Sequence, residues 1–318
     1  MTSTADTPSS YSELRAQLET LTTEAFRSEL SEIDQLSTLE IAKIMQGEDA
    51  TVPAAVATQL PRIASAIDAT AERMARGGRL IYAGAGTAGR LGVLDASECP
   101  PTFNTDPADI VGLIAGGPGA MVTAVEGAED SKELAAADLD GLGLTADDTV
   151  VGISASGRTP YAVGAVEHAR AAHGALTIGL SCNADSPLGS AAELGIEVVV
   201  GPELLTGSTR LKAGTAQKLV LNMLSTITMI RLGKTYGNLM VDLRASNEKL
   251  RARSRRIVAL ATGAGDETIE AALTQADDEV KNAILIVLAG VDGRTAARLL
   301  DEAQGHLRAA LRAATENG

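Results

Sequence analysis

Glycines and a carboxylate follow the first short apolar run of this chain, in a pattern suited to binding and acting on an anion. Residues 80–90 read LIYAGAGTAGR, so the run leads into Gly84, Gly86 and Gly89. Glycines let a backbone turn tightly and approach a ligand closely, and the N–H groups that open a helix carry a partial positive charge. A phosphate is the simplest ligand for such a turn. Because Glu98 follows in the same part of the chain, the pattern predicts an enzyme that acts on a phosphorylated metabolite.

The same glycines also match the G-x-G-x-x-G pattern of dinucleotide-binding proteins. That pattern needs an acidic residue about 20 positions further on, at the tip of the second strand, to hold a ribose. The next apolar run, 110–115, leads instead into Gly116 and Gly117. This disfavours a nicotinamide cofactor, and a tight turn without a ligand stays open as an alternative.

Two further loops are rich in small hydroxyl side chains. Residues 152–160 read GISASGRTP, and residues 205–215 read LTGSTRLKAGT. Hydroxyls, backbone N–H groups and a helix dipole together supply donors for a phosphate. Each loop also fits a simpler role as the cap of the helix that follows it. The candidate phosphate-binding residues of the three loops are Gly84, Gly86, Thr87, Ser154, Ser156, Arg158, Thr159, Ser208 and Lys212.

Short apolar runs alternate with helical patterns through the middle of the chain, which predicts an α/β fold with a doubly wound parallel sheet in three layers. Ligands of such sheets bind beyond the carboxyl ends of the strands, at a switch point. The loops after Ala83, Ala115, Ile153 and Ser181 are therefore expected around one cavity. The predicted strands are 80–83, 110–115, 149–153, 176–181 and 196–200, and the predicted helices are 88–95, 118–126, 160–173, 186–193 and 212–232.

On both sides of this alternating region, the sequence predicts helices and no strands. The spacing of apolar residues predicts helices within 12–46 and over 53–74, and beyond residue 245 over 247–260, 266–276, 278–288 and 295–314. We therefore expect an N-terminal helical arm (1–60), an α/β domain (61–245) and a small C-terminal helical domain (246–318).

Composition narrows the classes of partner. The net charge of −14 disfavours a nucleic acid, whose phosphates attract basic surfaces. The longest clean apolar run, 283–291, is short of the ~20 residues that a membrane-spanning helix needs. The N-terminus lacks the basic and apolar regions of a secretory signal. The expected location is cytoplasmic, with no membrane partner.

Cysteines and histidines give no metal pattern in the sequence. Cys99 and Cys182 belong to no CxxC pair, so neither a disulfide framework nor a zinc motif is predicted. His168, His173 and His306 lack the spacing of a ligand group, and the first two are interpreted as surface or helix-packing residues.

Several longer motifs resemble the N-acetylmuramic acid 6-phosphate etherase family, which has the sugar isomerase (SIS) fold. The resemblance implies cleavage of the lactyl ether of N-acetylmuramic acid 6-phosphate, by elimination and then addition of water, to N-acetylglucosamine 6-phosphate and D-lactate in cell-wall amino-sugar recycling. It also implies a homodimer built partly by the N-terminal arm, and no cofactor. The resembling segments are 84–102 (GAGTAGRLGVLDASECPPT), 125–130 (VEGAED), 156–161 (SGRTPY), 206–224 (TGSTRLKAGTAQKLVLNML), and 237–242 (GNLMVD) followed by 247–250.

The family's catalytic glutamates fall on Glu98, in DASE, and Glu129, in GAED. Two carboxyls suit the chemistry, because an alkoxide leaves only after an acid protonates it, and the C2 proton of the open-chain aldehyde needs a positioned base. No metal is required for this. One departure is Ala88, where the family usually has a serine, so one hydroxyl contact to the phosphate is expected to be missing.

Two other functions fit the same fold. One is a non-catalytic sugar-phosphate sensor, and the other is an aldose–ketose isomerase. Retention of both Glu98 and Glu129 favours an enzyme over a sensor, and DASECPPT and GAED are not the general signature of the isomerases.

Overall fold

A five-stranded parallel sheet lies at the centre of the protein in the computed structural model, which describes residues 20–242 and 248–316. The strand order is β2-β1-β3-β4-β5. The chain passes from β1 to β2 on one side and then crosses to β3 on the other side of β1, which creates a switch point between β1 and β3. The predicted doubly wound parallel sheet is confirmed. The strands are β1 (Leu80–Gly84), β2 (Ile110–Ile114), β3 (Thr149–Ile153), β4 (Leu176–Ser181) and β5 (Leu194–Glu197).

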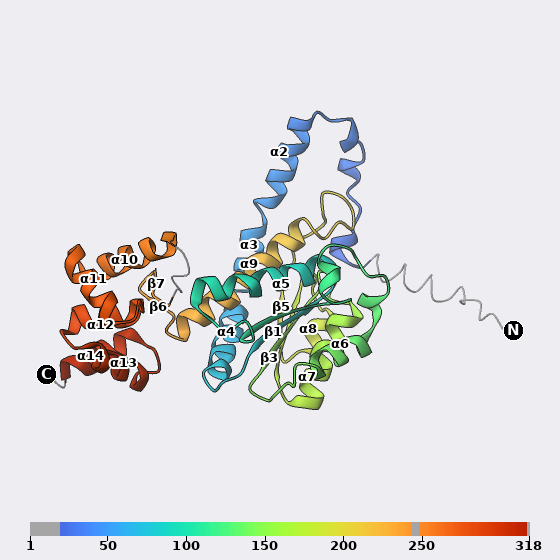
Figure 1. The fold of residues 1–318 in the computed structure, drawn as a ribbon. Helices are drawn as coiled ribbons and strands as arrows, with labels where there is room; N and C mark the ends of the chain where they lie inside the picture. The colour runs from blue at the N-terminus through green and yellow to red at the C-terminus, as the bar shows by residue number, and fades with distance from the viewer. Residues whose placement is uncertain (1–19, 243–247, 317–318) are drawn as a thin grey trace.

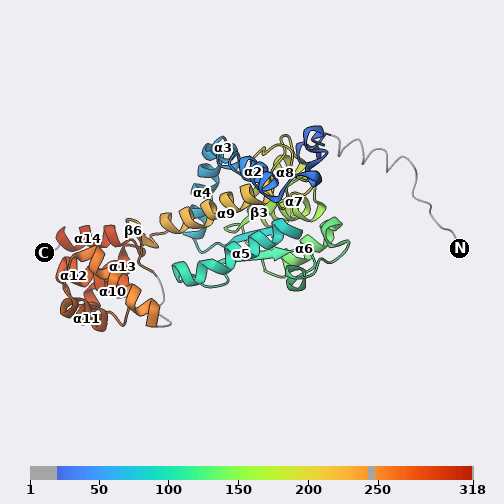
Figure 2. The same cartoon turned by 90° about the horizontal axis from the view of Figure 1, so that it is seen from above.

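Helices cover both faces of the sheet (Figures 1 and 2). The side chains of β1 alternate, so that Leu80 and Tyr82 join the core of one face while Ile81 and Ala83 join the core of the other. All four are buried, as expected for a strand covered on both sides. The helices are α4 (Leu60–Met74), α5 (Gly86–Phe103) and α9 (Lys212–Arg231) on one face, and α6 (Lys132–Asp140), α7 (Pro160–His173) and α8 (Pro187–Ala191) on the other.

Three of the predicted elements in this region formed differently. The predicted helix 88–95 is longer, because α5 runs from Gly86 to Phe103. The predicted helix 118–126 is only a 3-10 turn, Pro118–Met121, in a segment bounded by Gly117 and Gly127, which both have positive φ angles. The helix that crosses to β3 is α6, which the sequence analysis missed because only two of its residues, Ala135 and Leu139, are buried and give a short apolar pattern. The predicted strand 196–200 pairs at Leu194–Glu197 instead, and its apolar tail packs into the core without joining the sheet.

The N-terminal segment extends away from the sheet as an arm (Figure 1). Its main helix, α2 (Thr38–Asp49), starts at a capping box in which Ser37 and Glu40 each accept from the other's backbone N–H. Of the predicted helical pattern 12–46, residues 12–19 lie outside the described residues. The predicted helix 53–74 is two helices, α3 (Val52–Ala57) and α4. The arm begins with three 3-10 turns, Thr22–Glu24, Ser28–Leu30 and Ile33–Gln35.

The C-terminal part is helical, as predicted, and has a core of its own that begins with Val241. A short hairpin precedes its helices. The predicted helix 295–314 is broken in two by Gln304 and Gly305, whose φ angles of 51° and 78° no helix can continue. The elements are β6 (Thr235–Tyr236), β7 (Leu239–Met240), α10 (Glu248–Thr262), α11 (Asp266–Gln275), α12 (Val280–Ala289), α13 (Gly293–Glu302) and α14 (Leu307–Glu316). The domain boundaries at residues 60 and 245 stay predictions.

Candidate functional site

The turn after β1 holds the start of α5 directly against the strand. A Cβ on Gly89 would lie 2.5 Å from the carbonyl oxygen of Gly84, and Gly86 has a φ of +51°. No side chain caps α5 at Ala85. The glycines therefore bring the uncapped, positive end of α5 to the carboxyl edge of the sheet, as the phosphate prediction requires. Ala88, where the resemblance led us to expect a missing hydroxyl contact, is buried in the first turn of the helix.

The second loop is a cluster of hydroxyl groups beside that turn, because Gly84 pairs with Ile153 at the ends of β1 and β3. The hydroxyl of Ser154 lies 2.8 Å from that of Thr159 and 3.2 Å from that of Ser156. It also accepts a hydrogen bond from the N–H of Gly157.

Among the hydrogen-bonded residues of this loop, Arg158 alone has an exposed side chain. The hydroxyl of Ser156 accepts from the N–H of Arg158, at 3.2 Å, while the Arg158 side chain is exposed. No side chain caps α7 at Thr159. The loop thus presents clustered hydroxyls beside a second uncapped helix start, and the phosphate-binding role of its residues stays a prediction.

The start of α9 is occupied by a carboxylate of the chain itself. Glu203 is fully buried, and its two oxygens accept from the N–H groups of Lys212 and Ala213 at 2.9 and 3.0 Å. The Lys212 ammonium pairs with Glu48 of the arm at 2.6 Å, and Arg27 pairs with the same carboxylate at 2.6 Å. Lys212 was expected to contact the phosphate. Here it joins the arm to α9, and its role in binding stays a prediction.

The rest of this third loop lies close to the arm, since a Cβ on Gly207 would lie 2.8 Å from the Glu24 carboxylate, and the start of α9 lies close to the first loop. Ser208 is half-buried, and its N–H donates to the carbonyl of Leu205. The methyl group of Thr87 lies 3.5 Å from the position that a Cβ on Gly214 would take, so the starts of α5 and α9 are neighbours.

Glu129 lies on a short 3-10 turn at the rim of the first glycine turn. A cavity of about 200 Å³ is lined by Gly86, Arg90, Glu126 and Glu129. Arg90 donates to the carbonyls of Met121 and Ala120 at 2.9 and 2.8 Å, which holds this segment over α5. The structure therefore brings Glu129 beside the expected phosphate position.

Glu98 lies elsewhere on the surface of the chain. It is exposed on α5 and lines two cavities. One, of about 370 Å³, lies between α5, α9 and the β6–β7 hairpin, and the other, of about 260 Å³, lies between α5 and α9. Beneath it, Asp95 accepts from the hydroxyl of Tyr82 and the amide of Asn222 at 2.9 and 2.7 Å. Burial raises the pKa of Asp95, and these hydrogen bonds offset it only in part. Of the two acids in DASE, Asp95 is thus held in the interior and Glu98 faces solvent.

The described part of one chain therefore unites some of the predicted residues and separates others. Gly86 and Glu129 share one cavity, whereas Glu129 lines neither of the two cavities described above for Glu98.

Asn183 is a residue of this region that the sequence analysis missed. Its oxygen accepts from the N–H and hydroxyl of Thr22, both at 2.9 Å, and its amide donates to the hydroxyl of Thr23 and the carbonyl of Ala155, both at 3.0 Å. These bonds dock the start of the arm beside the second loop. Its position in the sequence could have indicated this role, because Asn183 follows β4 directly and so lies at the carboxyl edge of the sheet with the other loops.

Comparison with known proteins gives two family models and close relatives. The glucokinase regulatory protein N-terminal SIS domain matches residues 62–170, and the SIS domain matches residues 128–227. The N-acetylmuramic acid 6-phosphate etherase of Streptomyces avermitilis is 81% identical over 96% of this chain and 98% of its own. That of Streptomyces coelicolor is 80% identical over 99% of both chains. A solved phosphoheptose isomerase structure from Francisella tularensis aligns with 61% of this chain and 100% of its own, at 19% identity and a TM-score of 0.48.

Proposed function

This chain belongs to the N-acetylmuramic acid 6-phosphate etherase family and has the SIS fold, and we propose on that premise that it cleaves the lactyl ether of N-acetylmuramic acid 6-phosphate. The products are N-acetylglucosamine 6-phosphate and D-lactate. The main support for the proposal is sequence identity of 80% or more over nearly the whole length of two relatives that bear this name.

The geometry of the first turn supports this proposal. A phosphate at the uncapped start of α5 would put the attached sugar beside Glu129, which lines the same cavity as Gly86. The C2 proton is acidic only while C1 is an aldehyde, so we assign Glu129 to remove it. Glu98 would protonate the departing lactyl oxygen and then activate water, which adds to the carbon that the lactyl group has left. The hydroxyls of Ser154, Ser156 and Thr159 would supply further donors to the phosphate.

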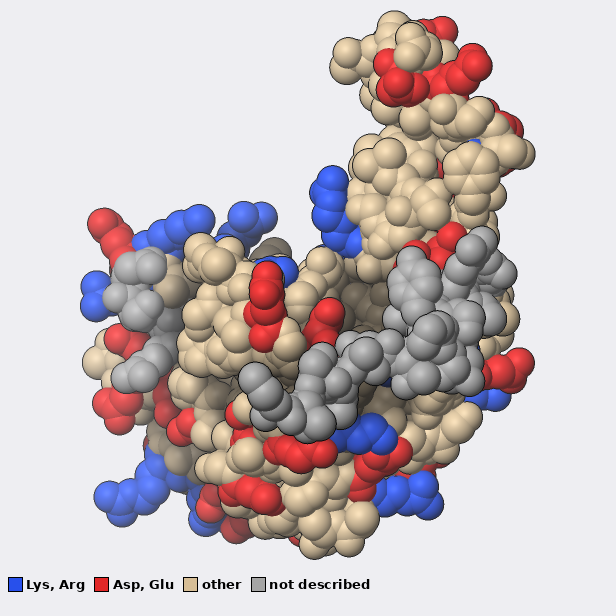
Figure 3. Space-filling view, turned by 90° about the vertical axis from the view of Figure 1, so that its right-hand side faces the viewer, with Lys and Arg blue, Asp and Glu red and all other residues tan. Residues whose placement is uncertain are grey.

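A homodimer is the second part of the proposal. The arm exposes apolar side chains, among them Phe26, Leu39 and Met45, and none of the residues of α2 is buried. Figure 3 shows uncharged surface along the projecting arm, with acidic side chains near its tip. A second copy would cover this surface. Because Glu98 and Glu129 line separate cavities of one chain, we propose that the site pairs Glu98 of one protomer with Glu129 of its partner.

The expected setting is the recycling of cell-wall amino sugars in the cytoplasm. Sugar phosphates carry charge and stay in the compartment where they are made, so an enzyme for them belongs there. Among the described helices, none is both long and apolar enough to cross a membrane.

Release of D-lactate by the purified protein tests the activity. The substrate should be N-acetylmuramic acid 6-phosphate, with unphosphorylated N-acetylmuramic acid as the control. The proposal expects D-lactate and N-acetylglucosamine 6-phosphate from the first and neither product from the second. Binding without lactate would indicate a sensor, and an aldose–ketose conversion without lactate would indicate an isomerase.

Mixing two impaired variants tests whether the site is shared between protomers. Glu98→Gln and Glu129→Gln should each be about 10²–10⁴-fold slower than the wild type when tested alone. After unfolding and refolding together, half of the dimers are mixed, and each mixed dimer has one site with both glutamates, so about one quarter of the wild-type activity should return. Activity that stays at the level of the separate variants would place both glutamates of a site in one protomer.

A further inference from the structure

Two histidines and an aspartate meet at the end of the sheet opposite to the substrate cavity. His168 and His173 lie on α7, and Asp140 is the last residue of α6. The Nε2 atoms of the two imidazoles lie 2.7 and 3.0 Å from the same oxygen, Oδ1 of Asp140. The two rings meet edge to face with centroids 5.3 Å apart. These three described residues form a group that could hold one metal ion, because their ligand atoms all lie within 4.8 Å of one another.

We infer that Asp140, His168 and His173 form a surface site for a zinc-like divalent transition metal, which links the ends of α6 and α7. Two imidazole nitrogens and a carboxylate oxygen are a ligand set that zinc accepts, with a fourth position left for water. Ligand atoms at about 2.0–2.1 Å from zinc lie roughly 3.3 Å apart in a tetrahedron. The two Asp140–His distances therefore need to open by only a few tenths of an ångström.

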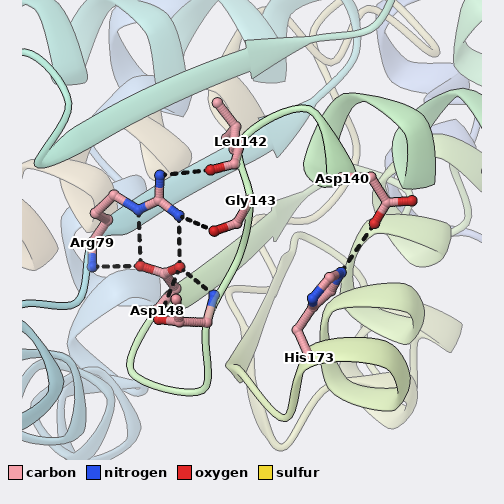
Figure 4. A network of polar contacts seen from close by, with 7 residues as sticks. Arg79, Asp140, Leu142, Gly143, Asp148 and His173 are labelled. Atoms are coloured by element: carbon pink, nitrogen blue, oxygen red, sulfur yellow. Dashed lines mark hydrogen bonds and ion pairs between the residues drawn. The ribbon is translucent and has the colours of Figure 1, made fainter.

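The ligands are held in place before any metal binds. Just after Asp140, the carbonyls of Leu142 and Gly143 accept from the Arg79 guanidinium at 3.0 and 3.2 Å, and Arg79 also pairs with Asp148 (Figure 4). The other two ligands belong to a helix whose opposite face is buried against the sheet. A site built on such supported elements loses little conformational entropy on binding.

The two helices are also fixed to each other. The hydroxyl of Tyr161 on α7 donates to Asp138 on α6 at 2.6 Å, and Lys132 pairs with Glu167 at 2.8 Å. The relative position of the three ligands therefore does not depend on the metal.

The charges around the cluster favour a cation. Asp140 and His173 are the last residues of their helices, where the helix dipole is negative and disfavours a carboxylate. The side chains remain accessible, since Asp140 is 55% exposed and the histidines are 26% and 21% exposed. A metal can reach the site from solvent, and it would compensate the carboxylate that the sequence places at an unfavourable helix end.

This site is independent of the proposed etherase chemistry. α7 starts at Pro160, beside the hydroxyl loop, and ends at His173, before the start of β4. The cluster thus lies at the other end of the helix from the substrate loops, and its role would be to stabilise the α6–α7 pair.

Titration calorimetry with zinc chloride on metal-free protein tests the inference. We expect one zinc ion per chain, and visible absorption bands of a low-symmetry complex when Co²⁺ replaces zinc. Loss of an outer-shell partner typically weakens metal affinity 10–100-fold, so Asp140→Asn, His168→Gln and His173→Gln should each weaken binding at least about tenfold. His306→Gln, which removes the histidine outside the cluster, should bind as the wild type does.

The zinc-induced rise in Tm provides a second measurement that does not depend on calorimetry. At the same zinc concentration, zinc should raise the Tm of the wild type and of His306→Gln by similar amounts, and should raise the Tm of Asp140→Asn by less. The inference is wrong if the wild type binds no zinc, or if the three cluster variants bind it as tightly as the wild type. Loss of binding in His306→Gln alone would place the metal elsewhere.

Discussion

Glu129 and Glu98 have different surroundings, and their roles can be separated by experiment. Glu129 lies beside the start of α5, and Glu98 lies on the outer face of the same helix. A general acid or base contributes about 10²–10⁴-fold, so Glu98→Gln and Glu129→Gln should each slow lactate release by that order. In D₂O, the C2 hydrogen of the substrate should still exchange in Glu98→Gln and should stop exchanging in Glu129→Gln, as followed by NMR.

Glu126 offers a matched control, because it lines the same cavity as Glu129. Glu126→Gln should release lactate at close to the wild-type rate. Exchange of C2 hydrogen at the wild-type rate in Glu129→Gln would show that another group removes this proton. If neither Glu98→Gln nor Glu129→Gln slows lactate release, both assignments fail.

Residue types and spacing predicted the hydroxyl loop and the glycine turn, but not the ion pairs around them. Lys212 follows a loop of small polar residues, which suggested a phosphate contact. Its partner Glu48 lies on the arm, far away in sequence, and a pairing between distant charges leaves no local pattern. Glu203 was missed for the same reason, since a buried carboxylate that caps a helix looks like any surface acid until the fold is known.

At the level of single elements, the packing of α5 against β1 depends on Gly89. A methyl group there would lie 2.5 Å from the carbonyl oxygen of Gly84 and 2.8 Å from the side chain of Ile114. Gly89→Ala should therefore push α5 away from the strand and lower stability by about 1–3 kcal/mol. A denaturant titration measures this, and lactate release should fall together with stability because the turn also carries the expected phosphate contacts.

Replacing Gly47 by alanine is expected to have the opposite effect on stability. It lies within α2, and a Cβ there meets nothing within 4 Å. Gly47→Ala should leave stability unchanged or raise it by about 0.5–1 kcal/mol, since alanine favours a helix over glycine. Equal stability losses in Gly89→Ala and Gly47→Ala would contradict the importance of the close contact at Gly89.

Elements with strong patterns were predictable, and those with short apolar patterns were not. Buried strands such as β3 and β4 form at the predicted residues, because continuous β-branched and leucine runs fit few other structures. α6 was missed because only two of its residues, Ala135 and Leu139, are buried and give a short apolar pattern. The helical pattern before α2 instead forms 3-10 turns, whose first residues are tied to Asn183 by side-chain hydrogen bonds that no periodicity shows.

The stability of the whole molecule at acid pH should depend on Asp148. Burial acts to raise the pKa of this carboxyl, but hydrogen bonds from the Arg79 guanidinium and from the N–H groups of Thr145 and Arg79 outweigh it, so the pKa is lowered. The ordinary pKa of an aspartate, about 3.9, applies to Asp148 in the unfolded state. Its lower pKa in the folded state therefore stabilises the fold at pH values above about 3.9, and this stabilisation is lost as the pH falls through the folded-state pKa.

Asp148→Asn should therefore lower the free energy of unfolding at pH 7 by about 1.5–3 kcal/mol, the range for hydrogen bonds to a charged group. The difference from the wild type should shrink as the pH falls below about 4. Unfolding curves at several pH values measure this. A difference that grows toward low pH would show that the folded state does not favour the charged form.

The arm is the part of the molecule whose role depends on a second copy. Leu39 is 64% exposed on α2, which projects away from the sheet (Figure 1). If the arm packs on a partner, Leu39→Glu places a charge in that apolar contact and should shift the protein toward monomer in analytical ultracentrifugation. Leu260→Glu is the matched control, because Leu260 is 62% exposed on α10 of the helical domain. If active sites need both protomers, lactate release by Leu39→Glu should fall more steeply on dilution than that of Leu260→Glu. An unchanged dimer in Leu39→Glu would show that the arm does not hold the two copies together, and full activity in a stable monomer would show that one chain contains a complete site.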